Sequence, residues 1–527
     1  MAALAGVSNA LILAVINTAA GSPSETISLQ PALIFILALL IYVKTQHFIL
    51  STTTIELEAT IHRLRLRLMD QVRCSELLPL ERIGRAEIIA GITKETTTLS
   101  QTATVLVIGA QAAVLILFTS IYIAYLSLPA FALSAAIISI AASLFLSRAQ
   151  RLKSETHEAL QWENRLFDRL TDLLDGFKEI RLNSHRSDDL FADTMEVSTT
   201  AAELKIKTQT DGLKQFVFSQ ASFYVVLGAI VFIAPTLSQS LGDSMGKTVT
   251  ALLFIIGAIT SVVQAIPLLR AANAAAENIA GLEDRLEGGG GVSTPPAETG
   301  PAAQFAKIEL RRVIFDYKDR FSDISFEVGP IDFVVRPGEL ILILGGNGSG
   351  KSTLLKLLVG LYQPNLGEIR LDAGHVTTAT RDNYRALFTA IFSDYHLFKR
   401  LYGISSPDSD EINGLLARFE LGGKTRVVDG EFSNLELSAG QRKRLAMVVA
   451  LLERRPVLVL DEWTADQDPE FRKKFYHELL PELQRSGRTI IAVTHDERYI
   501  RELTFPARII RMEEGRIVED YMLPQPS

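Results

Sequence analysis

Six long runs of apolar residues in the first half of the chain constrain its fold more than any other feature. They lie at Met1–Ala20, Gln30–Leu50, Thr102–Leu126, Pro129–Ser147, Phe216–Pro235 and Thr248–Leu269. Each run is close to the ~20 residues that an α-helix needs to cross the ~30 Å hydrocarbon core of a bilayer. A soluble helical core could also contain apolar helices, but runs this long with almost no charge favour membrane spans. The sequence therefore predicts an all-α domain with six transmembrane helices.

The distribution of Lys and Arg between these runs predicts their orientation. The long connections 51–101 and 148–214 are rich in basic residues, whereas the short connections contain none, at 21–29, 127–128 and 237–246. By the positive-inside rule, the long connections face the cytosol. Their apolar residues recur at helical spacing, as at Leu166, Leu170 and Leu173. We therefore expect the membrane helices to extend into the cytosol.

A stretch rich in Gly, Pro and small residues divides the chain at 288–304, which is the composition of a flexible connector. The 527 residues leave room for two or three domains. Beyond the connector, strands alternate with helices, which predicts an α/β domain. We therefore expect a transmembrane domain at 1–287, a linker at 288–304 and an α/β domain at 305–527.

Charge and cysteine content exclude two classes of function. The net charge of −7 leaves no overall basic field that could hold a polyanion, so nucleic acid is not expected as a partner. Cys74 is the only cysteine, which rules out an internal disulfide and a cysteine-based metal site.

A phosphate-binding loop is the most specific motif of the second half. The strand Leu340–Leu344 leads into a glycine-rich loop, and a helix follows; the loop and the first helical residues are Gly345, Gly346, Asn347, Gly348, Ser349, Gly350, Lys351, Ser352 and Thr353. In such a P-loop the backbone N–H groups surround phosphate oxygens at the positive end of the helix. We expect Lys351 to reach the β and γ phosphates of ATP and Ser352 to ligate Mg²⁺.

Two further strands end in polar residues that suit nucleotide hydrolysis. The apolar strand Val457–Leu460 ends in Asp461 and Glu462, and the strand Thr489–Thr494 ends in His495. We assign Asp461 to Mg²⁺, Glu462 to deprotonating the attacking water, and His495 to the γ-phosphate. The plainer alternatives are a carboxylate that caps the next helix and a histidine without a catalytic role.

The segment Leu437-Ser-Ala-Gly-Gln441 resembles the LSGGQ signature of ABC ATPases. With the P-loop, the Asp-Glu pair and the histidine, it completes four motifs in that family's order. The resemblance implies that Ser438 and Gly440 cap the γ-phosphate of ATP held by a partner's P-loop, with Gln441 beside them. A homodimer is therefore expected, because one chain completes no site.

Other site residues are carried over from the ABC family one by one. Tyr317 resembles the aromatic residue that stacks on adenine, although a core aromatic on a strand is the alternative. Asp468 matches the aspartate that the family uses for communication across the dimer. One position departs from the pattern, because Ser393 stands where most members have a glutamine that contacts Mg²⁺. We expect Asp394 to substitute for it.

Nearly the whole chain resembles the cyclic-peptide exporters of bacteria, of the syringomycin and pyoverdine type. The resemblance rests on segments in both halves, at Gly176–Asn183, Gly345–Thr353, Phe392–Asp394, Leu437–Leu445 and Asp461–Pro469. It implies a type IV ABC exporter in the lipid of the cell (inner) membrane, with a peptide-like or siderophore-like cargo. It also implies docking helices near Ser75–Gly84 and Leu173–Arg186. Such relatives usually begin before the counterpart of Gly6, so an entry helix is expected to be lacking.

Three other functions share this motor and stay open from the sequence. They are a lipid flippase or multidrug exporter, uptake instead of export, and a membrane ATPase that regulates a partner without transport. Polar residues within the apolar runs, such as Asn17 and Gln111, either hold helices together or line a cavity.

Overall fold

The computed structural model describes the chain in two compact units. The described residues are 11–18, 29–233, 241–287, 304–318, 325–404 and 408–523. One unit comprises Met1–Arg67 and Ile89–Ala280, and the other comprises Leu68–Ile88 and Gly281–Ser527. The second unit thus includes a short piece of the first basic connection. The expected linker lies outside the described residues except for its last position, and so does the start of the chain, on which the expectation about an entry helix depends.

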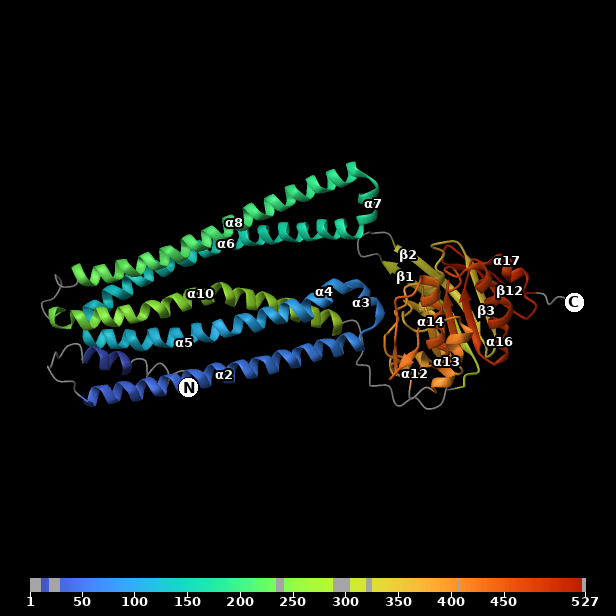
Figure 1. The fold of residues 1–527 in the computed structure, drawn as a ribbon, viewed down its shortest axis with the longest axis horizontal. Coiled ribbons are helices and arrows are strands. Elements are labelled where there is room, and N and C mark those ends of the chain that lie inside the picture. The colour runs from blue at the N-terminus through green and yellow to red at the C-terminus, as the bar shows by residue number, and fades with distance from the viewer. Residues whose placement is uncertain are drawn as a thin grey trace. The chain divides into compact units, whose positions relative to one another are not determined.

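Long helices make up the first unit. The helices that lie wholly or partly in it are a helix at 11–18, α2 (Leu29–Cys74), α4 (Arg85–Ala90), η1 (Gly91–Glu95), α5 (Thr96–Leu126), α6 (Leu128–Asp175), α7 (Phe177–Leu182), α8 (Ser184–Gly228), η2 (Ala229–Ile233) and α10 (Leu241–Glu287) (Figure 1). The last residues of α2 and α10 and most of α4 belong to the second unit. A helix of 46 residues such as α2 is about 70 Å long at 1.5 Å per residue. Since ~30 Å suffices to cross a bilayer, a helix of this length can reach beyond the membrane, and the expected cytoplasmic extension stays a prediction.

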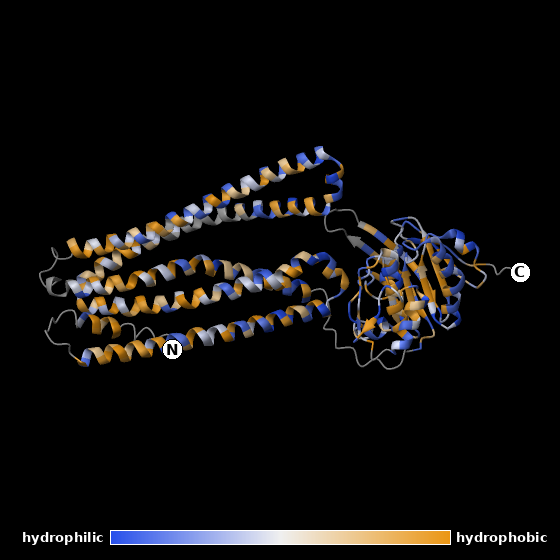
Figure 2. Cartoon of the chain, viewed as in Figure 1, coloured by the Kyte–Doolittle hydropathy of each residue, from blue (hydrophilic) through white to orange (hydrophobic). Residues whose placement is uncertain are grey.

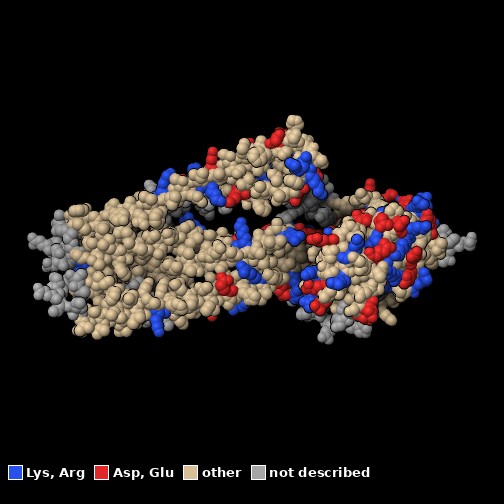
Figure 3. All heavy atoms as spheres, in the orientation of Figure 1, with Lys and Arg blue, Asp and Glu red and all other residues tan. Residues whose placement is uncertain are grey.

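Four of the described helical segments are long and apolar enough to cross a membrane: Leu29–Cys74, Arg85–Leu126, Ser184–Ile233 and Gly246–Glu287. A shorter apolar stretch covers Leu128–Leu144, and the first expected span lies largely outside the described residues. Hydrophobic residues predominate over long stretches of these helices (Figure 2). On the face shown in Figure 3, charged side chains are sparse over the left part of the first unit and dense over the second unit. The first unit is therefore an apolar helical membrane domain.

Polar side chains within the apolar helices hold neighbouring helices together. The Asn17 side chain is 2% exposed, and its amide donates to the Tyr122 hydroxyl at 3.2 Å and to the Lys247 carbonyl at 3.1 Å. Gln46 donates to the Gln111 side-chain oxygen at 2.8 Å. Hydrogen bonds of this kind are favoured in lipid, where no water competes for the polar groups. Of the two open readings, the structure supports helix association for Asn17 and Gln111.

Three sheets and short helices form the second unit. A four-stranded sheet has the order β2 (Ser325–Val335), β1 (Ile308–Lys318), β4 (Leu366–Leu371), β5 (Gly374–His375). A six-stranded sheet has the order β12 (Arg516–Met522), β11 (Arg508–Glu513), β3 (Leu340–Gly345), β10 (Thr489–Val493), β9 (Val457–Asp461), β6 (Phe388–Ile391), and β7 (Val427–Val428) pairs with β8 (Glu431–Phe432). The helices are α3 (Leu77–Ile83), α11 (Lys351–Leu358), α12 (Arg381–Arg385), α13 (Ser409–Arg418), α14 (Ala439–Leu452), α15 (Pro469–Lys474), η3 (Phe475–Leu479), α16 (Leu480–Arg485) and α17 (Glu497–Arg501).

The six-stranded sheet separates two apolar cores. On β3, Leu340, Leu342 and Leu344 belong to one core cluster, whereas Ile341 and Ile343 belong to the other. Alternation of this kind follows from the two-residue period of a strand. The first cluster is closed by residues of α13, α14, α15 and α16, and the second by residues of α11, β1 and β2. The predicted α/β domain is therefore present.

Within the second unit, the start of α3 is held against α12 by a shared carboxylate. Glu76, at the N-terminal end of α3, accepts a hydrogen bond from Arg381 Nη1 at 2.9 Å and another from Arg385 Nη2. The Glu76 side chain is 14% exposed and the Arg381 side chain 10%, so the pair is poorly screened by water. The docking segment expected near Ser75–Gly84 is thereby confirmed. The second expected segment contains α7, and its docking stays a prediction.

Replacing Glu76 with alanine should detach this segment. Loss of charge-assisted hydrogen bonds worth roughly 1.5–3 kcal/mol should lower protection from hydrogen exchange at 75–84 by about tenfold or more. Deuterium uptake followed by mass spectrometry measures this, with Glu56→Ala on an exposed face of α2 as the control. Unchanged uptake at 75–84 in Glu76→Ala would show that the carboxylate does not hold the segment.

Candidate functional site

Three parallel strands bring the sequence motifs to one edge of the six-stranded sheet. β3 and β9 both pair with β10 in parallel, so the carboxyl ends of all three lie together. β3 ends at the P-loop, β9 ends at Asp461, and β10 is followed by His495. The backbone N–H of Glu462 donates to the Val493 carbonyl at 3.1 Å, which fixes the end of β9 to the end of β10.

The P-loop folds around the ammonium group of Lys351. Lys351 Nζ donates to the carbonyl oxygens of Gly345 at 3.1 Å and Gly346 at 2.8 Å. Lys351 is 5% exposed, and burial lowers its pKa, although Glu462 and Asp461 oppose this shift. A Cβ on Gly345 would lie 2.3 Å from the Met512 carbonyl, so only glycine fits here. The loop is thus packed closely against Met512, and it encloses the ammonium group of Lys351.

An open depression of about 650 Å³ lies over the P-loop. Its lining includes the predicted residues Asn347, Gly348, Gly350, Lys351, Ser352, Thr353 and Glu462. Phe326, Lys356 and Tyr362 also line it, and the sequence analysis missed them. The sequence could have indicated Lys356, because this residue lies on α11, the helix that follows the P-loop. No local pattern indicates Phe326 or Tyr362. None of the described residues that line this depression belongs to the signature segment.

Asp461 has the environment of a metal ligand. Asp461 is 2% exposed, and burial raises its pKa. The Ser352 hydroxyl and the Ser393 backbone N–H donate hydrogen bonds to it. Within the described residues, Asp461 Oδ1 is buried without a hydrogen-bond partner. A buried carboxylate oxygen with an open position, next to a hydroxyl, fits a divalent cation such as Mg²⁺. Asp394 is exposed, and its expected role as a ligand stays a prediction.

Glu462 and His495 face each other at the edge of the sheet. His495 Nε2 lies 3.1 Å from Glu462 Oε1, and both side chains are partly exposed. Glu462 has a φ of 49°, a left-handed conformation that is uncommon for a residue with a side chain. The two side chains are close enough to share a hydrogen bond, and both are in part accessible to solvent.

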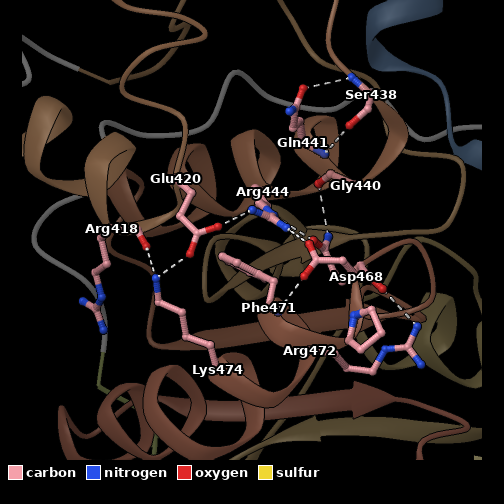
Figure 4. Close-up of polar contacts among 12 residues, drawn as sticks. Arg418, Glu420, Ser438, Gly440, Gln441, Arg444, Asp468, Phe471, Arg472 and Lys474 are labelled. Carbon is pink, nitrogen blue, oxygen red and sulfur yellow. Dashed lines mark hydrogen bonds and ion pairs between the residues drawn. The ribbon is translucent and has the colours of Figure 1, made fainter.

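The signature segment begins α14 with a reciprocal cap. The Ser438 hydroxyl accepts from the Gln441 N–H at 3.4 Å, and the Gln441 side chain accepts from the Ser438 N–H at 3.2 Å (Figure 4). A Cβ on Gly440 would lie 2.6 Å from the Asp466 carbonyl, so glycine lets the helix pack directly on the following loop. The cap orders a helix N-terminus, which is an arrangement suited to binding an anion.

Asp468 makes contacts within its own chain. It caps α15 by accepting from the Phe471 N–H at 2.8 Å, and it forms an ion pair with Arg444 of α14 (Figure 4). The Phe471 N–H and then Arg444 hold the pKa of Asp468 below its usual value. Its expected role across a dimer stays a prediction. The side chain of Tyr317 lies outside the described part, although its backbone pairs with Phe326 in β1 and β2.

A P-loop with this acidic pair, joined to apolar helices, defines an ATP-driven membrane transporter. The family model for "ABC transporter" matches residues 328–465. The ATP-binding protein SyrD of Pseudomonas syringae pv. syringae is 33% identical over 87% of this chain and 82% of its own length. The ATP-dependent lipid A-core flippase of Burkholderia thailandensis is 27% identical over 71% of this chain and 62% of its own length. The chain therefore belongs to the ABC transporter family.

Two further relatives bear on the architecture. The mycobactin import ATP-binding/permease protein IrtB of Mycolicibacterium smegmatis is 32% identical over 43% of this chain and 39% of its own length. The structure of a bacterial Atm1-family ABC exporter with ATP bound superposes with a TM-score of 0.77 at 17% identity, covering 98% of this chain and 93% of that one. The fold is that of a type IV exporter half-transporter, and the protein couples ATP hydrolysis to transport.

Proposed function

We propose that two copies of this chain form a homodimer that exports a peptide-like or siderophore-like molecule through the cell membrane. In this proposal residues 1–287 form the membrane domain, 288–304 the linker and 305–527 the cytoplasmic ATPase domain. The carrying observation is the similarity to SyrD, which extends over 87% of the chain and therefore over both units. The family resemblance of the sequence motifs supports the same assignment.

Each ATP site is proposed to combine the P-loop of one copy with the signature of the other. Lys351 and the loop N–H groups would bind the phosphates, and Ser438 and Gly440 of the partner would cap the γ-phosphate. Ser352 and Asp461 would hold Mg²⁺, which neutralises developing phosphate charge when bound. Glu462 accepts a proton from the attacking water, while His495 orients that carboxylate through the 3.1 Å contact.

An apolar cavity in the membrane domain suits a cargo with an apolar part. The cavity has a volume of about 270 Å³ and lies among α5, α6, α8 and α10, with Ile116, Ile138, Phe218, Val226 and Ile259 in its wall. A cavity of this size could take a short hydrocarbon segment or an aromatic side chain of a larger molecule. This favours an amphipathic peptide over a highly charged solute.

A lipid or drug as cargo is the second candidate, because the lipid A-core flippase of Burkholderia thailandensis is similar over 71% of the chain. An apolar cavity would serve such a cargo as well. Uptake is a third outcome to test, since one similar protein is named for mycobactin import. A purely regulatory ATPase is less favoured, because Glu76 connects the ATPase unit to the first cytoplasmic connection.

Transport in proteoliposomes should separate these candidates. With outward-facing ATPase domains, a cyclic lipopeptide or a peptide siderophore is expected to accumulate inside the vesicles and to stimulate ATP hydrolysis about twofold or more. A fluorescent phospholipid is the competing cargo, and Glu462→Gln vesicles are the control for leakage. Stimulation by the phospholipid alone would favour the flippase, and efflux of preloaded siderophore would favour uptake.

A further inference from the structure

Lys443 of α14 is a buried lysine that binds the loop after β9 at two points. Its side chain is 7% exposed, and its Nζ donates to the Glu462 carbonyl at 2.8 Å and pairs with Asp466 Oδ2 at 2.8 Å. In the opposite direction, Trp463 Nε1 donates to the Lys443 carbonyl at 2.8 Å. A buried ammonium group is costly unless it is paired, so the lysine and this loop hold each other in one arrangement.

These contacts act on the backbone of Glu462. Its N–H is held by the Val493 carbonyl at 3.1 Å, and its carbonyl is held by Lys443. Between them the residue keeps the left-handed φ of 49° that an L residue rarely adopts. A conformation of this kind persists only when its surroundings impose it. The direction of the Glu462 side chain toward His495 therefore depends on both backbone contacts.

Arg444, the residue after Lys443, also fixes α14 to the loop that follows β9. Arg444 is 8% exposed, and its Nε donates to the Gln467 side-chain oxygen at 2.8 Å, while its Nη2 pairs with Asp468 (Figure 4). Gln467 in turn donates to the Gly440 carbonyl at 3.1 Å in the first turn of α14. The signature end of α14 and the loop 462–468 are thus packed as one body.

We propose that Lys443 is a positioning residue for hydrolysis. Its hydrogen bond to the Glu462 carbonyl fixes the position of the Glu462 carboxylate relative to the signature helix α14. ATP bound at the N-terminus of α14 in one site then influences Glu462 of the same chain, which serves the other site. The inference rests on the proposed roles of Glu462 and the signature. It adds a residue that contacts neither ATP nor the attacking water.

Lys443→Met tests the hydrogen bond, since methionine fills similar space without a donor. We expect kcat for ATP hydrolysis to fall about tenfold or more, because small displacements of a catalytic group are costly. KM and the affinity for a fluorescent ATP analogue should stay within about threefold, because Lys443 does not line the depression. Lys443→Gln keeps an N–H donor without the charge and should restore kcat to within about threefold. Lys473→Met, at an exposed position on α15, is the matched control.

The variants separate the possible results. A wild-type kcat in Lys443→Met would overturn the proposal. A loss of kcat in Lys443→Gln as large as in Lys443→Met would also overturn it, and would point to the ion pair with Asp466. If Lys443→Met does not fold, thermal unfolding shows this, and near-normal kcat in Lys443→Gln still supports the proposal. Glu462→Gln is measured in parallel. Full turnover in that variant would refute the proposed base, whereas its inactivity with an active Lys443→Met refutes only the role of Lys443.

Discussion

Glu462→Gln is expected to lower ATP turnover by about 10²–10⁴-fold while leaving ATP binding intact. Removing a general base costs this much, because water must then lose its proton without a positioned acceptor. Binding should persist, since the P-loop and Lys351 are unchanged and glutamine has the same shape. Phosphate release measures turnover, and a fluorescent ATP analogue measures affinity.

A second result follows for the dimer. If two chains enclose each ATP, the variant should accumulate as a stable ATP-bound dimer, which size-exclusion chromatography with light scattering can detect. Glu470→Gln, at an exposed position close to the site in sequence, is the control and should hydrolyse ATP normally. Turnover like that of the wild type in Glu462→Gln would rule out Glu462 as the base. A strictly monomeric protein with full turnover would rule out the shared site.

Lys351→Met is expected to weaken ATP binding by about 10–100-fold and to remove most turnover. In this structure the Lys351 ammonium group donates to the Gly345 and Gly346 carbonyls. When ATP binds, we expect it to donate to the phosphates instead. Charge-assisted hydrogen bonds contribute roughly 1.5–3 kcal/mol, which corresponds to this change in affinity. Methionine keeps the apolar length of the side chain but supplies no charge or donor. Titration with a fluorescent ATP analogue measures the dissociation constant.

The control for this substitution is Lys424→Met, because Lys424 is exposed and outside the depression. It should bind and hydrolyse ATP as the wild type does. An unchanged dissociation constant in Lys351→Met would show that the phosphates are held without this lysine. The two variants differ in kind, since Glu462→Gln keeps the nucleotide and Lys351→Met loses it, so the pair separates binding from hydrolysis.

Local chemistry in the sequence predicts a nucleotide site, and the structure brings several of its residues together. Neighbouring residues alone suffice to infer a role for the P-loop glycines, for Lys351 and for the acidic pair after a buried strand. The apolar runs likewise predicted the membrane helices, because length and hydrophobicity decide whether a helix can lie in lipid. Parallel strands then require that their carboxyl ends meet, and the 3.1 Å contact of Glu462 with His495 agrees with this.

Contacts between distant segments could not be predicted in the same way. Glu76 pairs with Arg381 and Arg385 about three hundred positions away, and no pattern in the sequence marks these three residues as partners. Tyr362 lines the depression over the P-loop, yet no local pattern in the sequence indicates this. Packing alone decides which of several chemically similar side chains meet.

By itself, the sequence determined the class of each half, the place of the P-loop and the order of the catalytic motifs, because these depend on periodicity and on short-range backbone chemistry. Only the tertiary structure decided that Asp461 keeps one buried oxygen open, that α3 docks through a shared carboxylate, and that Lys443 supports Glu462. The physical reason is that hydrogen bonding and burial depend on distances in space, which a linear pattern of residue types does not specify.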